Sequence, residues 1–359
     1  MGCLQQATAA KAEVEAAGYR CPDWRAVWEG QRPEQVADAE PGEWRHGWQY
    51  YAATQLDKQH RDRAILPSMT LASRALVRSQ AGRGAGAHLT ALPVDEARTL
   101  KPHLLRVVLL RRLRLQLPLD TRTCKCGGCV DTLGDHRSAC PTVGKLARRA
   151  MPLERTWARV CREAGATVFH NYFLRELNLE EHLRADDGRR LEVVADGLPF
   201  WSGAQVALDA TLVSPVRRDG TAYPRTAAEN GVRLEAARRR KELKYPELLD
   251  QRRSKLVVAA MEIGGRWSEE AWTFLTLLAQ AKARSAPGVM RRSTTYTLLR
   301  RWSTMLAVAA QSAYASSLLG ESSAQMIPHE DLLPEWGGAC YRTERCPQRG
   351  RADWCRRVA

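Results

Sequence analysis

Five side chains that can bind a soft metal ion are gathered in one short stretch of the chain. The segment CKCGGCVDTLGDHRSAC holds Cys124, Cys126, Cys129, His136 and Cys140. Zinc prefers four thiolate or imidazole ligands in a tetrahedron, and short knuckles supply two from a glycine-containing turn and two from a following element. His136 and Cys140 are four residues apart, so one helical turn would direct both side chains toward a common ion. This spacing predicts a structural Zn²⁺ site.

Five candidates compete for the four positions of such a site. We favour Cys124, Cys126, His136 and Cys140 as the zinc ligands, and Cys129 is able to replace one of the first two. The alternative is a turn with buried thiols and no metal. A closed four-ligand site stabilises a small fold and leaves no open position for catalysis.

A second group of reactive side chains combines acids in apolar strands with lysines on a charged helix. Glu192 lies in the segment LEVVA, Asp209 in QVALDATLV, and Lys241 and Lys244 in EAARRRKELKYPEL. Cleavage of a phosphodiester needs carboxylates that hold one or two divalent ions, with a lysine nearby to stabilise charge or orient water. Burying Asp209 in so apolar a run would be costly without a cation or a hydrogen-bond donor. We therefore predict a catalytic group of Glu192, Asp209, Lys241 and Lys244, with Mg²⁺ or Mn²⁺ on the two acids.

Each of these residues also has a simpler interpretation. Asp209 would then be a strand-edge carboxylate paired with an arginine, and the two lysines would form a solvated helical face. Asp196 precedes Gly197, a pair that is typical of a turn, but it is an alternative acid. Glu262, near the end of the apolar segment KLVVAAMEI, is a further alternative acid or an arginine partner.

The charge balance predicts a polyanionic partner. The 359 residues include 55 Lys+Arg and 40 Asp+Glu, which gives a formal net charge of +15. Each cation placed on a phosphate releases a condensed counterion, so nucleic acid is favoured, although an acidic membrane surface or protein would also attract this charge. The arginines predicted to contact nucleic acid are Arg111, Arg112, Arg114, Arg148, Arg149, Arg238, Arg239 and Arg240. For the first three, an amphipathic packing helix with solvated arginines is the alternative.

Secretion and membrane insertion are not expected. The most apolar runs, 104–119 and 298–315, are interrupted by arginines, whereas a membrane span needs about 20 largely uncharged residues. The N-terminus has no apolar core of a secretory signal. We therefore expect an intracellular chain whose cysteines are thiols or metal ligands.

The elements that must position these residues alternate between strands and helices. Strand-like patterns occur at 191–195, 205–213 and 255–263, and helical patterns at 153–164, 227–244 and 269–283. This order, with one nearly continuous apolar strand, predicts an α/β (α+β) core with helices packed on a mixed sheet. Residues 65–119 are predicted to be helical around a glycine-rich break.

Four motifs follow one another along residues 100–285. They are the CxC-G…DxxGDHxxxC knuckle, an Arg-Arg-x-acid-Val strand, an LDxTxV strand and the segment KYPEL. Their order resembles the C-terminal region of non-LTR retrotransposon polyproteins that carry a CCHC zinc knuckle and a restriction-like endonuclease of the PD-(D/E)xK superfamily. With this resemblance, we predict a helical region at 1–120, the knuckle at 121–150 and a restriction-endonuclease-like mixed sheet flanked by helices at 151–320. The composition of the remaining residues, 321–359, indicates a basic Cys/Arg-rich tail.

The resemblance also implies roles for individual residues. The first metal-binding acid of the family falls on Glu192, with Asp196 as a register alternative, and the second falls on Asp209. The displaced lysine falls on Lys241 or Lys244. The chain departs from the family pattern because Glu replaces the usual Asp at the first acid, no Pro precedes it, and Thr occupies the in-line lysine position of the simple D-x-K form.

The function implied is that of a metal-dependent DNA endonuclease that nicks target DNA for target-primed reverse transcription. Its partners would be DNA and the RNA of the element, and its location would be nuclear. The sequence holds no (F/Y)xDD aspartate pair, so we do not expect a polymerase in this chain. The alternative is a catalytically inactive, zinc-containing nucleic-acid-binding remnant, and a third possibility is a host-adopted scaffold.

Overall fold

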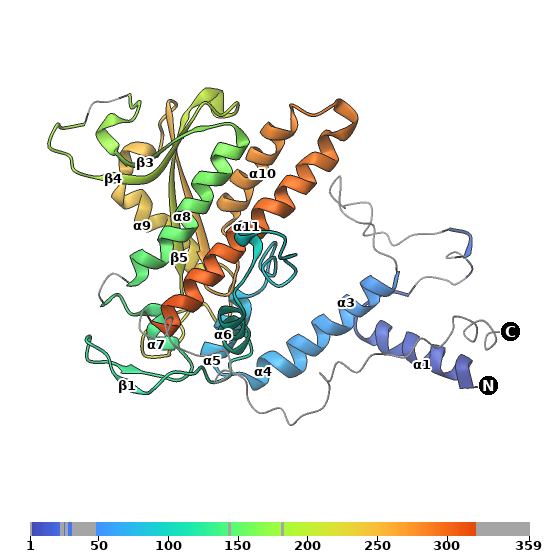
Figure 1. Ribbon diagram of the computed structural model, residues 1–359. Helices are drawn as coiled ribbons and strands as arrows, with labels where there is room; N and C mark the ends of the chain where they lie inside the picture. Colours follow the sequence, from blue (N-terminus) through green and yellow to red (C-terminus); the bar gives the residue numbers. More distant parts are fainter. Residues whose placement is uncertain are drawn as a thin grey trace, which may run out of the picture.

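A computed structural model of the protein describes residues 2–21, 25, 28–30, 48–142, 145–180 and 183–320. The predicted tail at 321–359 lies outside these residues. Two N-terminal helices, α1 (Gly2–Ala16) and α3 (Trp48–His60), extend away from the other elements (Figure 1). Through one π-helical turn, Arg61–Ile65, α3 continues into the short α4 (Leu66–Ser68) and so reaches the main body.

A mixed four-stranded sheet lies at the centre of the main body. Across the sheet the order is β3 (Thr167–Phe173), β4 (Arg190–Asp196), β5 (Gln205–Val213) and β6 (Ser254–Glu262). The first two pairings are antiparallel, and β5 pairs with β6 in parallel. Both parallel strands are buried along nearly their whole length, as expected for strands that are covered on both faces.

Helices cover the two faces of this sheet. On one face lie α8 (Lys145–Ala164), α10 (Glu269–Ala283) and α11 (Arg291–Leu319), which contribute Trp157, Phe274 and Trp302 to the larger core (Figure 1). On the other face lies α9 (Val232–Lys244), which connects the two parallel strands. The predicted mixed α/β architecture is therefore confirmed. None of the helices in the described part of the chain is long and apolar enough to cross a membrane.

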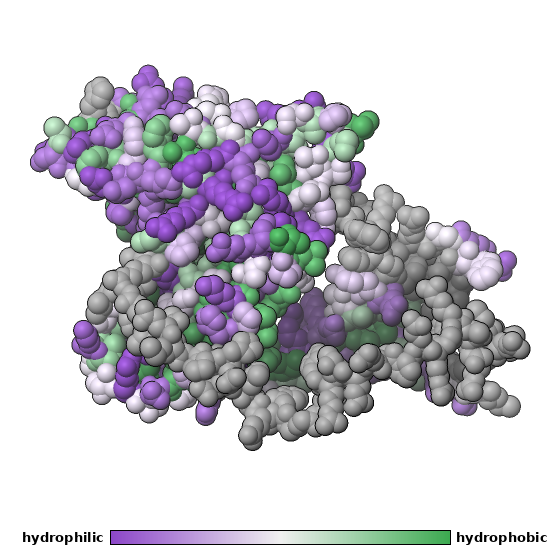
Figure 2. Space-filling view, in the orientation of Figure 1, coloured by the Kyte–Doolittle hydropathy of each residue, from purple (hydrophilic) through white to green (hydrophobic). Residues whose placement is uncertain are grey.

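The helices before the Cys/His segment belong to the same core. Both α5 (Leu71–Ser79) and α6 (Pro102–Arg112) place buried side chains in one cluster with the sheet. The Cys/His segment itself forms a two-stranded hairpin, β1 (Arg122–Thr123) and β2 (Cys129–Val130), followed by the short α7 (Asp135–Ala139). Hydrophilic side chains cover most of the upper part of the face seen in Figure 2.

A buried ion-pair network fastens the Cys/His segment to α6 and α11. The side chain of Asp135 is 4% exposed and accepts hydrogen bonds from Arg111, at 2.6 Å, and from Arg114, also at 2.6 Å. Arg111 also donates to the hydroxyl of Tyr314, at 3.0 Å, and to the carbonyl of Leu133. Burial alone would raise the pKa of Asp135, but the two guanidinium groups outweigh it and hold that pKa below its usual value. Arg111 and Arg114 were predicted to contact nucleic acid; in the structure both bind Asp135 inside the fold, and a contact with nucleic acid stays a prediction.

Removing the charge of Asp135 tests this network. We expect Asp135→Asn to lower the free energy of unfolding by about 3–5 kcal/mol, because two arginines then lose their common counter-ion in a buried position. Glu229→Gln is the matched control, since it breaks an exposed i,i+4 pair with Arg225 and should cost less than about 1 kcal/mol. Equilibrium unfolding in urea measures both values. Equal losses in the two variants would contradict a structural role for the network.

Candidate metal centre and candidate active site

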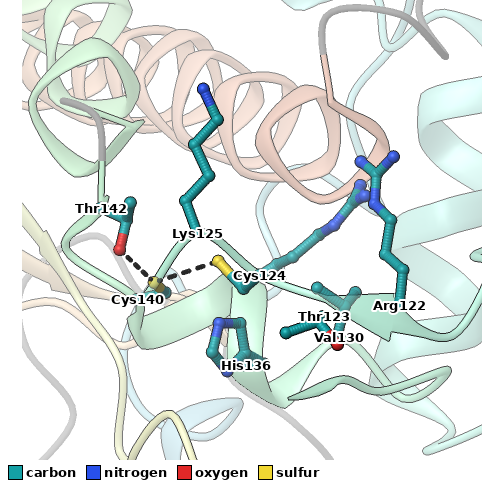
Figure 3. Close-up of a pocket in the computed structure, with 9 residues that line it drawn as sticks. Arg122, Thr123, Cys124, Lys125, Val130, His136, Cys140 and Thr142 are labelled. Atoms are coloured by element: carbon teal, nitrogen blue, oxygen red, sulfur yellow. Dashed lines mark hydrogen bonds between the residues drawn. The ribbon is translucent and has the colours of Figure 1, made fainter. Parts of the chain in front are cut away.

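Four of the five predicted metal ligands converge. The ligand atoms of Cys124, Cys126, His136 and Cys140 all lie within 4.8 Å of one another, so this cluster could bind a metal ion such as zinc. Figure 3 shows Cys124 and Cys140 facing each other beside His136; their sulfur atoms are 3.9 Å apart. Cys129 is exposed, and its thiol donates to the carbonyl of Val130 at 3.6 Å. The structure thus brings together the favoured set and leaves the alternative ligand outside it.

The backbone of the hairpin and of α7 sets this geometry. Gly127 has a φ of +82°, and a Cβ on Gly128 would lie 2.6 Å from Cε1 of His136. Glycine therefore permits both the tight turn and the close approach of the imidazole. At the start of α7, the carboxylate of Asp131 accepts hydrogen bonds from the backbone N–H groups of Asp135, at 3.0 Å, and His136, at 2.7 Å.

The ring of His136 connects the metal centre to the rest of the molecule. Its Nδ1 lies 3.0 Å from the carbonyl oxygen of Arg218, and a carbonyl can only accept, so Nδ1 donates. This hydrogen bond leaves Nε2, 3.4 Å from the sulfur of Cys126, as the ligand atom. The backbone N–H of Gly128 lowers the pKa of the Cys126 thiol to about 6, which favours the thiolate that a metal ion needs.

The two predicted acids lie side by side where β4 and β5 separate. The pairing of these strands runs from Ala195↔Val206 to Val193↔Leu208, and Glu192 and Asp209 are the next residues on each strand. The strand pairing does not continue to Glu192 and Asp209. Instead, the carboxylate of Glu192 accepts a hydrogen bond from the backbone N–H of Ala210 at 3.0 Å. The alternation of side chains along each strand then directs both acids to the face covered by α9.

Lys241 reaches both acids from α9. Its ammonium donates to Oδ2 of Asp209 and lies 4.0 Å from Oε1 of Glu192. Asp209 is 1% exposed, and its other oxygen, Oδ1, is buried without a hydrogen-bond partner among the described residues. Lys244 lies further out, with its ammonium 4.7 Å from the centre of the Tyr245 ring, but it still acts electrostatically on Asp209.

A third acid, Glu154 of α8, faces the same site and was not predicted. Burial is the main reason why the pKa of Glu154 is raised, and the neighbouring charge of Asp209 raises that pKa further. The sequence did contain a signal, because Ala150 and Ala158, four residues before and after, place Glu154 on a face of small side chains. A carboxylate on such a face approaches the sheet closely, and only the packing of α8 against β5 reveals which residues it meets.

The negative charges of this site are only partly balanced. Burial, together with the charges of Asp209 and Glu154, raises the pKa of Glu192 to about 8. The pKa of Asp209 is also raised by burial, although Lys241 opposes that shift. Three carboxyl groups thus share one directly bonded ammonium, an arrangement that favours the entry of a cation or a proton.

The two alternative acids lie elsewhere. Asp196 closes the turn after β4, where it accepts a hydrogen bond from the N–H of Gly197 at 2.8 Å. Glu262 ends β6 with Arg266 3.7 Å away, and in the parallel register it lies beside Val213 rather than Asp209. Burial raises the pKa of Glu262 to about 7. The turn interpretation of Asp196 and the arginine-partner interpretation of Glu262 therefore fit the structure.

A cleft of about 790 Å³ joins the acids to the Cys/His segment. Glu154, Glu192 and the strand residues after Asp209 line one part of it, and Ser138, Ala139 and Pro141 line another. The basic side chains that line the cleft are Arg149, Arg217, Arg218, Arg233, Arg240, Lys241 and Lys244. The Cys/His segment and one of the two predicted acids, Glu192, thus border one basic cleft.

The other predicted nucleic-acid contacts divide into internal and exposed arginines. Arg112 donates to the carbonyl of Gly264 at 2.9 Å, and Arg238 pairs with Glu242 and Glu270. Both make contacts within the fold while staying partly exposed, and their contact with nucleic acid stays a prediction. Arg239 and Arg240 are exposed on α9, Arg149 is buried in the wall of the cleft, and the side chain of Arg148 lies outside the described residues.

The metal content of cysteine variants tests the ligand set. We expect purified wild-type protein and Cys129→Ser to hold one zinc ion per chain, because Cys129 is outside the cluster. Cys126→Ser should lose the ion, since a hydroxyl is a poor zinc ligand. Inductively coupled plasma mass spectrometry measures the ratio. If Cys129→Ser lost zinc while Cys126→Ser retained it, Cys129 rather than Cys126 would be the fourth ligand and the proposed ligand set would be wrong.

The raised pKa of Glu192 predicts a pH-dependent stability. Between its usual value of 4.5 and about 8, the folded state binds more protons at this site than the unfolded state. In buffer without divalent ions, the free energy of unfolding should therefore fall as the pH rises through this window. Glu192→Gln should be more stable than wild type above about pH 8 and lose that advantage near about pH 5.

Thermal unfolding across this pH range provides the measurement. Glu235→Gln removes an exposed carboxyl from α9 and serves as the control, which should follow the wild-type curve. A wild-type curve that rises from pH 5 to pH 8 relative to Glu192→Gln would show that Glu192 is charged in the folded protein.

Comparison with known proteins gives no family. No protein-family model matches this chain, and no curated protein matches its sequence. The resemblance drawn from the motifs therefore stays a prediction. The geometry of the cleft, with its acids, its lysine and its neighbouring Cys/His cluster, is what supports a function for this chain.

Proposed function

We propose that this protein is a metal-dependent DNA endonuclease that hydrolyses phosphodiester bonds in the cleft between the sheet and the Cys/His segment. The observation that supports it most is the position of Asp209. This carboxylate is almost fully buried, has one oxygen bonded to Lys241, and has the other without a hydrogen-bond partner in the described part of the chain. A buried carboxylate oxygen is costly to leave unpaired, and a bound cation would satisfy it.

The donor set fits a hard divalent ion. Mg²⁺ is bound through one or two carboxylates and keeps several waters, so Glu192 and Asp209 with an open cleft beside them are suitable ligands. When bound, Mg²⁺ or Mn²⁺ would polarise the phosphoryl oxygen and lower the pKa of a water molecule. Glu154, which lines the same cleft, would complete the ligand set or hold a water molecule.

The chain's own residues would supply orientation and charge. Lys241 is held beside both acids, where its ammonium can stabilise the negative charge that develops on the phosphoryl group. Tyr245 fixes the end of α9, because its hydroxyl donates to the carbonyl of Arg190 at 3.0 Å. Lys244 and Arg240 line the outer cleft and would contact the substrate backbone rather than the reacting atoms.

The wider assignment rests on the resemblance of the motifs. We propose that the mixed sheet with helices on both faces is restriction-endonuclease-like and that the Cys/His cluster holds structural zinc. Nicking of a chromosomal target would prime reverse transcription in the nucleus, with DNA and the RNA of the element as partners. The rival function is a zinc-containing remnant that binds nucleic acid without cleaving it. The direct pair of Lys241 with Asp209 favours this rival, because the ammonium neutralises part of the acid charge that would attract a divalent ion.

Nicking of supercoiled plasmid tests this proposal. We expect the wild-type protein to convert supercoiled DNA to the nicked form with Mg²⁺ and not without it. Asp209→Asn should lower the rate by about 100-fold or more, because it removes a metal ligand and the partner of Lys241. Lys241→Met should cause a loss of similar size.

The control is an acid on the same strand as Glu192. Asp196→Asn should retain the wild-type rate, because Asp196 closes a turn away from the cleft. Equal nicking by wild type and Asp209→Asn would contradict the proposed site. DNA binding without Mg²⁺-dependent products in the wild-type protein would favour the non-catalytic remnant.

A further inference from the structure

We propose that Arg217 and Arg233, held together on the ring of Tyr223, form a subsite for a backbone phosphate of DNA. This subsite deepens the proposed function and rests on it, because it assumes that DNA occupies the cleft. It would bind the strand away from the reacting phosphate. The two arginines come from different elements, the loop after β5 and the start of α9.

Tyr223 brings the two arginines together. The guanidinium carbon of Arg233 lies 3.7 Å from the centre of the Tyr223 ring, and that of Arg217 lies 5.3 Å from it. Both distances are within the range of a cation–π interaction. All three side chains line the same cleft as Glu192 and Lys241. Two like charges are thus gathered at one wall of the cleft by an aromatic ring.

Neither arginine has a carboxylate partner within ion-pair distance among the described residues. Other arginines nearby do, since Arg225 pairs with Glu229, and Arg238 with Glu242 and Glu270. The Nε of Arg233 is buried and has no hydrogen-bond acceptor in the described part of the chain. Paired guanidinium groups without counter-ions are suited to an anion with several oxygen acceptors, and a phosphate group is such an anion.

Arg149 adds an independent positive charge to the same wall. Its side chain is 3% exposed, and its guanidinium donates to two carbonyl oxygens, of Ser138 at 3.0 Å and of Leu212 at 3.4 Å. Its Nε has no partner among the described residues, and carbonyl groups do not neutralise its charge. A buried cation of this kind raises the potential at the wall of the cleft and favours an anion there.

The arrangement favours a polyanion over a single small anion. Arg217, Arg218 and Arg240 are exposed along the cleft, so the positive charge extends beyond the Tyr223 subsite. Nucleic acid presents a phosphate every few ångströms along a strand and can occupy several such positions at once. The loop with Arg217 is also fixed to the metal centre, because the carbonyl of Arg218 accepts from His136.

The salt dependence of DNA binding tests the subsite. Fluorescence anisotropy with a short labelled DNA duplex, without added divalent ions, measures the association constant at salt concentrations between about 50 and 200 mM. The slope of its logarithm against the logarithm of the salt concentration reports the number of phosphate contacts. Arg217→Gln with Arg233→Gln should reduce the magnitude of this slope by about 0.9, because the one phosphate contact of the subsite is lost, and Arg217→Gln alone should reduce it by part of that amount. Tyr223→Leu should act like the double variant, whereas Tyr223→Phe, which keeps the ring, should retain the wild-type slope.

Arg292→Gln with Arg300→Gln is the matched control. It removes the same net charge from exposed positions on α11 that do not line the cleft. A slope change as large in this control as in the Arg217/Arg233 variant would overturn the subsite. If the double cleft variant fails to fold, Arg217→Gln alone decides, because its side chain is exposed.

The outcomes separate this inference from the proposed function. Wild-type nicking with no slope change in Arg217→Gln would overturn the subsite and leave the nuclease in place. A reduced slope in Arg217→Gln and no nicking by the wild-type protein would retain the subsite and overturn the nuclease. A wild-type slope near zero would overturn the subsite directly, because no phosphate contacts would then be made.

Discussion

The contact between Lys241 and Asp209 is the interaction on which the site depends. An aspartate buried in the middle of an apolar strand cannot stay ionised without a nearby cation, and the ammonium from α9 supplies one. That contact fixes α9 against the face of the sheet where Glu192 also lies. It leaves one oxygen of Asp209 without a partner in the described part of the chain, and two further carboxyl groups close by. The fold thus gathers three carboxyl groups around one ammonium group inside a strongly basic molecule.

The Cys/His segment is part of the same construction rather than an appendage. Asp135 binds it to two arginines of the preceding helical segment, and His136 binds it to the loop that follows β5. Both connections involve residues within or next to the metal cluster. The segment therefore forms one wall of the cleft, and its folding and the shape of the cleft are physically coupled. A metal ion bound by the cluster would then influence the shape of the cleft without any open coordination position.

Much of the site followed from the sequence because its signals are local. The strand at 205–213 and the helix at 269–283 occur with the predicted bounds, since an apolar run defines the strand and the cap at Ser268 marks the start of the helix. Helix α9 begins later than predicted, after Gly231 with a φ of +77°, because residues 227–231 form turns and bends. The edge strand β3 was not predicted, since its polar and exposed residues lack the pattern of a buried strand.

What the sequence did not provide are contacts between distant segments. Arg111 looks like a surface residue in a basic run, yet it is buried because Asp135 and Tyr314, 24 and 203 residues away, surround it. Glu154 belongs to the acid site only because α8 packs against β5. Net charge likewise predicted a polyanionic partner but could not distinguish arginines that support the fold from those that line the cleft.

The location of a bound Mn²⁺ ion tests the central claim most directly. Crystals of the protein soaked in Mn²⁺ and measured at the manganese absorption edge would show the ion as an anomalous difference peak. We predict a peak between Glu192 and Asp209, with carboxylate oxygens about 2.0–2.6 Å from the ion. Full occupancy of Mn²⁺ elsewhere in the molecule, with no peak beside Asp209, would contradict the assignment of these acids as a metal-dependent active site.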